Sequence, residues 1–202
     1  MVSPERFSNL PEYAFPRLRA LLDAHPSGGE PINMTIGEPR HPFPGWVEDV
    51  LTRHIAEFAK YPPNPGTPAL LETIGGWLHH RYGVNFGPER IIARNGTREG
   101  LYNAAMALCP PDANVLIPNP FYPVYGVAAL SVGATPIFVP ATAETDFLPD
   151  FASLPADTLN KTAIAYLCSP TNPQGAVATQ GYWQDLLSLA ETYDFRIFAD
   201  EC

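Results

Sequence analysis

The 202-residue sequence contains 46% hydrophobic and 16% charged residues, a composition typical of a folded globular protein and unlike that of a disordered chain. Its net charge is −9 and no stretch is rich in Lys or Arg, which argues against a nucleic-acid-binding surface because such a surface needs clustered cations. No segment reaches the roughly 20 uncharged apolar residues of a membrane span, and the N-terminus lacks the basic and apolar regions of a signal peptide, so we expect a cytoplasmic protein with no membrane partner.

The first part of the chain predicts helices joined by turns, with one short strand. The expected elements are, in chain order, a helix at 12–25, a strand at 32–39, and helices at 45–60 and 67–82. Pro16 is expected to interrupt the first helix. The last of these helices has clear start signals, since Thr67 suits the N-cap and Pro68 the first helical position.

From residue 90 onward, short apolar strands alternate with helices. The expected strands are 90–94, 114–118, 135–140, 162–168 and 195–200, and the expected helices are 97–108, 122–132 and 179–193. Apolar strands that alternate with helices are typical of a parallel sheet covered on both faces. We therefore expect an α/β fold with three layers, αβα, around a mostly parallel sheet. Ligands of such sheets bind at the carboxyl ends of the strands.

Two of the turns at these strand ends have both a functional and an ordinary structural interpretation. In RNGTRE, Gly96 makes a bend before a helix start, where backbone N–H groups and the Thr97 hydroxyl could hold a phosphate. The alternative is an ordinary strand–helix turn with a Thr cap. In PNPFYPVY, Tyr122 could stack on a flat heterocycle, or Tyr122 and Tyr125 could be core residues of the next helix.

Two further turns carry an amide and a carboxylate. Asn172, in SPTNPQG, is either a simple turn residue or an amide held over a bound molecule. Asp200 directly follows an apolar run, where a carboxylate is costly to bury unless it pairs with a cation such as a protonated ring nitrogen. Its alternative role is an acidic helix cap. Together the four turns would surround one small ligand with a phosphate cup, an aromatic ring, an amide and a carboxylate.

The order and spacing of these motifs resemble the N-terminal half of the class I/II aminotransferases of fold type I, over nearly the whole chain. The matching segments are IGEP, YPPNPGTPALLETIGGWL, NGTREG, NPFYPVY, SPTNPQG and FADE. The resemblance implies pyridoxal 5′-phosphate as cofactor, and an amino acid and a 2-oxo acid as substrates. It implies an N-terminal arm with part of the small domain at 1–40, and an incomplete N-terminal part of the cofactor-binding large domain at 41–202.

The resemblance also implies roles for individual residues. It implies that Gly96, Thr97 and Arg98 hold the cofactor phosphate and that Tyr122 stacks on the pyridine ring. Asn172 would donate to the phenolic oxygen of the ring, and Asp200 would pair with the ring nitrogen. Tyr61 would reach the phosphate of the neighbouring subunit's cofactor, and Gly37 would contact the substrate carboxylate. The reach of Tyr61 into a neighbouring subunit implies a homodimer. No metal is implied.

The lysine that forms the Schiff base in this family has no counterpart here. The sequence contains only Lys60 and Lys161, and neither occupies the expected place. We therefore expect a truncated aminotransferase that is inactive by itself.

The segments TIGEPRHPFPGWV and NGTRE resemble the succinyldiaminopimelate transaminases of lysine biosynthesis. The alternatives are a general aspartate or aromatic amino acid aminotransferase, or a non-catalytic domain of the same fold.

Overall fold

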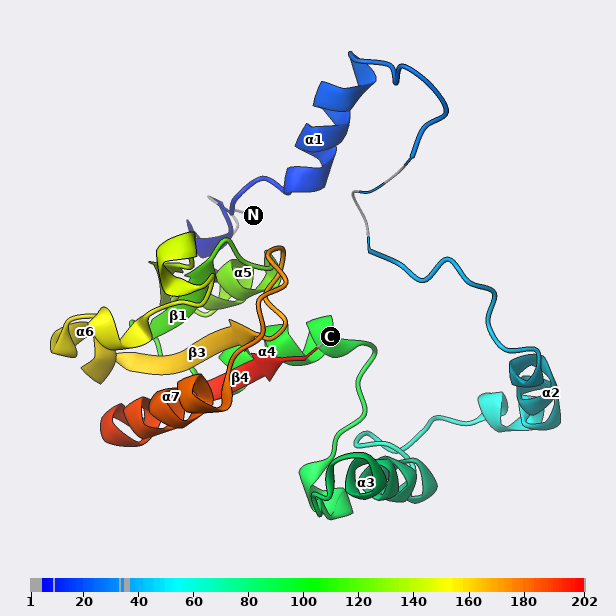
Figure 1. Ribbon diagram of the computed structural model, residues 1–202. Helices are drawn as coiled ribbons and strands as arrows, with labels where there is room; N and C mark the ends of the chain where they lie inside the picture. Colours follow the sequence, from blue (N-terminus) through cyan, green and yellow to red (C-terminus); the bar gives the residue numbers. More distant parts are fainter. Residues whose placement is uncertain (1–4, 9, 33, 35–36, 202) are drawn as a thin grey trace. The chain divides into compact units, whose positions relative to one another are not determined.

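The computed structural model describes residues 5–8, 10–32, 34 and 37–201, which cluster into two compact units (Figure 1). One unit comprises Met1–Ala14 with Arg94–Cys202, and the other comprises Phe15–Ala93. The domain boundary predicted after residue 40 lies within the second unit and stays a prediction. In the described ranges, no helix is both long and apolar enough to cross a membrane.

The first unit is built on four parallel strands in the order β2-β1-β3-β4. The strands are β1 (Asn114–Asn119), β2 (Thr135–Pro140), β3 (Thr162–Cys168) and β4 (Arg196–Asp200). The helices are α4 (Thr97–Leu108), α5 (Val124–Ser131), α6 (Ala156–Asn160) and α7 (Gln180–Tyr193), with short 3-10 turns at Glu5–Phe7, Ala143–Thr145 and Phe151–Ser153. All but α6 and the 3-10 turns were expected from the sequence.

Helices cover both faces of this sheet (Figure 1), because successive strand residues point to opposite sides. Val115 and Ile117 of β1 pack with residues of α4 and α5 in one buried cluster. Leu116, between them, packs on the other face in a cluster with Leu186 and Ala190 of α7. The prediction of a three-layer α/β fold with a parallel sheet is therefore confirmed.

The strand predicted at 90–94 is wrong. Residues Pro88–Arg90 form a 3-10 turn, and the following residues pair with no strand in the described part of the chain. Ile91 nevertheless has an extended backbone, with φ −121° and ψ 133°. The apolar residues thus favour the extended conformation, but a strand also requires a hydrogen-bonding neighbour.

The regular secondary structure among the described residues of the second unit consists of helices and 3-10 turns. They are α1 (Ala14–Asp23, which begins in the first unit), α2 (Trp46–Arg53), α3 (Pro68–Tyr82) and the 3-10 turns Ile55–Ala59 and Pro88–Arg90. α3 is capped as predicted, because the Thr67 hydroxyl accepts from the backbone N–H of Leu70 at 3.3 Å. Pro16 does not interrupt α1, since it lies in the first turn, where its missing N–H has no helical partner to lose.

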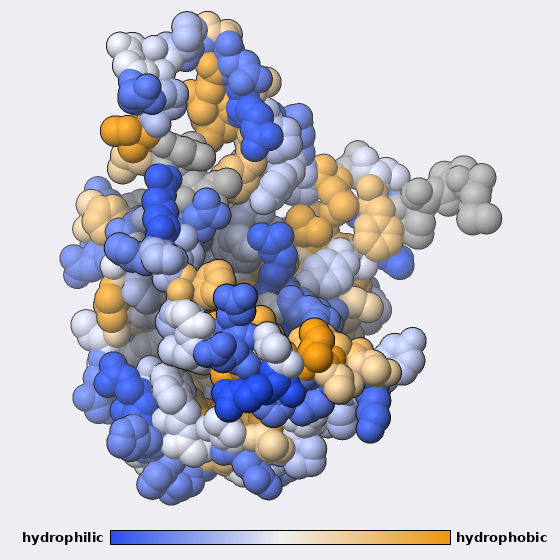
Figure 2. Space-filling model, turned by 90° about the vertical axis from the view of Figure 1, so that its right-hand side faces the viewer, coloured by the Kyte–Doolittle hydropathy of each residue, from blue (hydrophilic) through white to orange (hydrophobic). Residues whose placement is uncertain are grey.

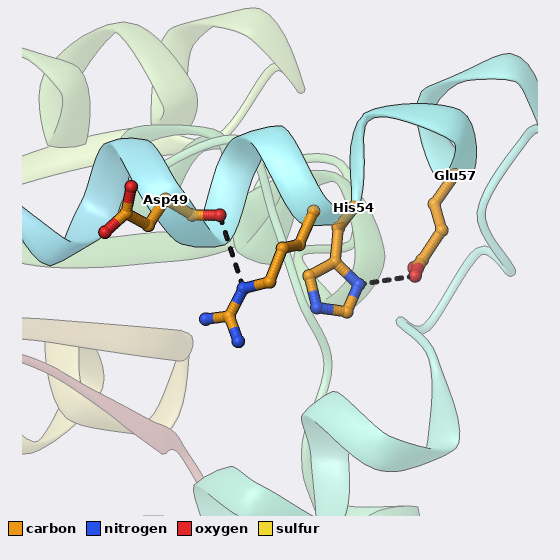
Figure 3. A network of polar contacts seen from close by, with 4 residues as sticks. Asp49, His54 and Glu57 are labelled. Carbon is orange, nitrogen blue, oxygen red and sulfur yellow. Dashed lines mark hydrogen bonds and ion pairs between the residues drawn. The ribbon is translucent and has the colours of Figure 1, made fainter.

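Two other predictions for this unit need correction or fall partly outside the structure. The single helix predicted at 45–60 is divided, because His54 leaves the helical conformation with ψ 9°. The polar contacts around this break are local (Figure 3): the Arg53 Nε–H donates to the Asp49 carbonyl at 3.3 Å, and His54 Nδ1 lies 2.6 Å from a Glu57 carboxylate oxygen. Of the strand predicted at 32–39, residues 33, 35 and 36 lie outside the described residues, and the others have no regular secondary structure.

Candidate functional site

The order of the strands places a candidate site between β1 and β3. From β1 the chain continues to β2 on one side, whereas β3 is followed by β4 on the other. In open parallel sheets this switch point, at the carboxyl ends of the strands, is where ligands bind. A small cavity lies there, and its walls are formed by Pro118, Pro120, Phe121, Tyr122, Tyr125, Ala141, Cys168, Thr171, Asn172 and Gln174. Tyr122 and Asn172 in this set are site residues that the sequence predicts.

Asn172 lies in a turn that Thr171 closes with several hydrogen bonds. The backbone N–H of Thr171 donates to the Ala176 carbonyl at 2.8 Å, and its hydroxyl accepts from the Ala176 N–H at 2.9 Å. The Gly175 N–H donates back to the Thr171 carbonyl at 2.7 Å. Gly175 has φ +79°, a conformation that favours glycine. The turn therefore holds its own shape, and the Asn172 side chain is not needed to close it.

Asp200 is buried at the end of β4, next to the end of β3. Asp200 pairs in register with Cys168 of β3, and the residue is only 6% exposed. The Tyr125 hydroxyl donates to Asp200 Oδ2 at 2.6 Å. Burial, together with this carboxylate, raises the pKa of Tyr125 far above its usual range, so the hydroxyl keeps its proton and acts as the donor. In the described residues, no Lys, Arg or His forms an ion pair with Asp200.

A line of aromatic contacts connects Asp200 to the start of α4. The ring of Tyr125 is stacked on Tyr166, with centroids 4.6 Å apart, and meets the ring of Tyr122 edge-on at 5.9 Å. The hydroxyl of Tyr122 accepts a hydrogen bond from Arg98 Nε at 2.5 Å. A chain of side-chain contacts thus joins Arg98, at the start of α4, to Asp200 at the end of β4.

The start of α4 has the geometry that the sequence predicted for the RNGTRE turn. Gly96 precedes the helix with φ +91°, and Thr97 is the first helical residue. The Glu99 carboxylate accepts from the Asn95 N–H at 2.9 Å, so it satisfies one N–H of the turn. β3 holds this helix in place, because the Tyr166 hydroxyl donates to the Leu101 carbonyl at 2.6 Å.

Two polar residues of the site were not assigned by the sequence reasoning. Tyr125 was considered only as a core residue, and it is both buried and bonded to Asp200. Gln174 carries the only buried side-chain oxygen or nitrogen without a hydrogen-bond partner in the described residues, its Oε1. Its amide nitrogen donates to the Ala141 carbonyl at 3.4 Å, which directs that oxygen away from Ala141. The SPTNPQG motif contains Gln174, but nothing in its type or spacing distinguishes it from a turn residue.

Tyr61, Gly37 and the lysines remain to be considered. Tyr61 and Gly37 are exposed residues of the second unit, which is described by itself, so their roles stay predictions. Lys161 lies just before β3, at the amino end of the sheet. β3 has seven residues, so its first and last residues are about 20 Å apart at about 3.3 Å per residue. Lys161 therefore lies far from the carboxyl-end site.

Comparison with known proteins gives a consistent family. The sequence model of the family described as aminotransferase class I and II matches residues 30–202. An LL-diaminopimelate aminotransferase from Moorella thermoacetica is 32% identical over 204 residues, which cover 99% of this chain and 52% of the relative. One from Desulforudis audaxviator is also 32% identical, over 98% of this chain and 52% of the relative. The chain spans about half the length of the curated relatives it matches.

Solved structures give the same result. A crystal structure of an aminotransferase from Neisseria meningitidis superposes with a TM-score of 0.91 at 32% identity, covering 98% of this chain and 52% of that one. An aspartate aminotransferase from Thermotoga maritima superposes with a TM-score of 0.83 at 28% identity, covering 98% of this chain and 53% of that one.

Proposed function

Because the chain belongs to the class I and II aminotransferase family, we propose that its site at the ends of β1, β3 and β4 binds pyridoxal 5′-phosphate for transfer of an amino group between an amino acid and a 2-oxo acid. When bound, this cofactor supplies the electron sink that draws electrons from the substrate Cα. The residues of this chain would hold and orient it.

The observation that carries the proposal is that the buried carboxylate of Asp200 forms no ion pair with a cation among the described residues. Burying a charged Asp200 is costly unless an opposite charge or several donors compensate for it, and the described chain supplies one donor, the Tyr125 hydroxyl. At the other end of the contact line, Arg98 has no carboxylate partner in the described residues. A flat ligand with a protonated ring nitrogen and an anionic group fits this distribution of charge.

The donor set of the site fits the same ligand. Asp200 would hold the proton on the ring nitrogen, since a neighbouring carboxylate favours the charged form of that nitrogen. Asn172 would donate to the phenolic oxygen, and Gly96 with Thr97 would present backbone N–H groups and a hydroxyl to the phosphate. The cavity itself, at about 10 Å³, has room for one water molecule, so the ring would lie over the side chains at its mouth.

The test is binding of pyridoxamine 5′-phosphate, which carries an amine in place of the aldehyde and therefore cannot react with surface lysines. We expect saturable binding, measured by the circular dichroism that the bound ring acquires. Asp200→Asn should weaken binding at least about tenfold, the ratio that corresponds to about 1.4 kcal/mol. Glu201→Gln is the matched control, because Glu201 is the exposed neighbour of Asp200 in sequence, and it should leave binding unchanged. No saturable binding, or equal effects of the two variants, would contradict the proposal.

We further propose that the amino acid substrate is of the diaminopimelate type, either free or N-succinylated. The names of the relatives at 32% identity and the TIGEPRHPFPGWV and NGTRE segments support it. The alternative is aspartate, in line with the Thermotoga maritima structure. Assay of the natural gene product that carries this sequence with LL-diaminopimelate, its N-succinyl derivative and aspartate, each against 2-oxoglutarate, would distinguish them. The 202-residue chain by itself should not transfer amino groups, because its Lys161 is at the wrong end of the sheet and neither lysine matches the family's position.

A further inference from the structure

Arg98 makes a contact that a phosphate-binding role does not require. It is the second residue of α4 and is exposed, yet its Nε–H donates to the Tyr122 hydroxyl at 2.5 Å, across 24 residues of sequence. The central carbon of its guanidinium lies 5.6 Å from the centre of the Tyr122 ring. Two interactions, a hydrogen bond and a cation–π contact, therefore join Arg98 to one aromatic side chain.

The second anchor of Tyr122 lies on the protein interior. Tyr122 is half-buried, and its ring meets the ring of Tyr125 edge-on at an interplanar angle of 81°. Tyr125 is itself fixed, because it is fully buried, stacked on Tyr166 and bonded to Asp200. The torsion that turns a tyrosine ring about its own axis has a broad energy well. The hydroxyl lies on that axis, so its hydrogen bond with Arg98 holds the far end of the ring in place. The guanidinium beside the ring opposes rotation about the axis and so keeps the tilt.

We propose that Arg98 is a positioning residue that fixes the ring of Tyr122, so that this ring is presented at a constant tilt to the flat ring of the ligand. The role rests on the function proposed above and is separate from the phosphate contact that the family resemblance implies. It predicts that Arg98 affects the binding of an aromatic ligand whether or not that ligand carries a phosphate.

The experiment compares two probes, pyridoxamine 5′-phosphate and pyridoxamine, which differ only in the phosphate. Both are titrated against the wild-type chain, Arg98→Gln, Tyr122→Phe and the double variant. Arg94→Gln is the matched control, since Arg94 is an exposed arginine of the same unit. Denaturant unfolding of each variant checks that the fold is retained.

We expect Arg98→Gln to weaken both probes by about fivefold, the ratio that corresponds to about 1 kcal/mol. Tyr122→Phe should have a similar effect, because it removes the hydroxyl that Arg98 holds. The double variant should bind no more weakly than Tyr122→Phe alone, because residues that act through one contact are not additive. A ligand-free readout accompanies the titrations: the Arg98 Nε–H resonance should exchange with water more slowly in the wild-type chain than in Tyr122→Phe.

Three results would overturn the role of Arg98. A loss confined to pyridoxamine 5′-phosphate would make Arg98 a phosphate ligand. Additive losses in the double variant would show that Arg98 and Tyr122 act independently, and equal exchange of the Nε–H in both chains would show that the contact does not persist in solution. If the wild-type chain binds neither probe, both the proposed function and the role of Arg98 fail. If the wild-type chain binds and Arg98→Gln binds equally well, only the role of Arg98 fails.

Discussion

At the scale of single residues, the stability of the site depends on the hydrogen bond between Tyr125 and Asp200. Tyr125→Phe removes the described donor to a buried carboxylate while it keeps the ring that stacks on Tyr166. Leaving a buried acceptor unsatisfied costs about 1–3 kcal/mol, so we expect the free energy of unfolding to fall by about that amount in denaturant titrations.

The control for this substitution is Tyr102→Phe in α4. Tyr102 is half-buried, and the described residues give its hydroxyl no hydrogen-bond partner. Its removal should change the free energy of unfolding by less than about 0.5 kcal/mol. Equal losses in the two variants would mean that the bond to Asp200 contributes nothing to stability.

The sequence predicts site residues where chemistry and position agree, and fails where only the fold brings groups together. Asn172 and Asp200 follow apolar strands, so their type and place were sufficient to select them. Of the two interpretations of PNPFYPVY, the core role holds for Tyr125, which also bonds to Asp200, whereas the stacking role of Tyr122 stays a prediction. The contact between Arg98 and Tyr122 links residues 24 apart, and no local pattern encodes a partnership of that kind.

At the scale of elements, α7 has a start that can be tested by one substitution. The Thr179 hydroxyl accepts from the Tyr182 N–H at 3.1 Å, which satisfies one of the free donors at the helix start. Thr179→Ala should lower the free energy of unfolding by about 1 kcal/mol, the usual value of such a cap. Since α7 covers one face of the sheet, the loss should appear in the global unfolding transition.

Ser188→Ala, in the interior of the same helix, is the control. The Ser188 hydroxyl only donates back to the Gln184 carbonyl at 2.9 Å, and Ala is the better helix former. Its free energy of unfolding should stay unchanged or rise slightly. A loss as large as that of Thr179→Ala would show that hydroxyls on α7 matter irrespective of capping.

The elements that the sequence predicted correctly are those that local signals and burial specify together. The strands 114–118, 135–140 and 162–168 are apolar and bounded by turns, and they match β1, β2 and β3 closely. The strand predicted at 90–94 has the same local character but no neighbour in the described chain. Pairing is a property of the whole sheet, which a pattern within five residues does not report.

At the scale of the whole molecule, the two units differ in how much they bury. The first contains two apolar clusters on opposite faces of its sheet. Among the described residues of the second, only Gly66 and Leu71 are buried. Large apolar side chains such as Trp46, Phe58 and Tyr61 are exposed there, at 65%, 71% and 102%, and Figure 2 shows hydrophobic side chains at the surface of the face it presents.

This difference predicts unequal local stability within one chain. Segments with few buried apolar contacts open at low free energy, whereas buried strands open only with global unfolding. After correction for intrinsic exchange rates, amides of α3 should therefore exchange with deuterium at least about a hundredfold faster than those of β1 and β3. This ratio corresponds to a difference in opening free energy of about 2.8 kcal/mol. Hydrogen–deuterium exchange with peptide-level mass spectrometry measures both in one sample, and β2, at the edge of the same sheet, serves as an internal reference. Protection of α3 equal to that of β3 would mean that the second unit gains stability from contacts beyond its own two buried residues.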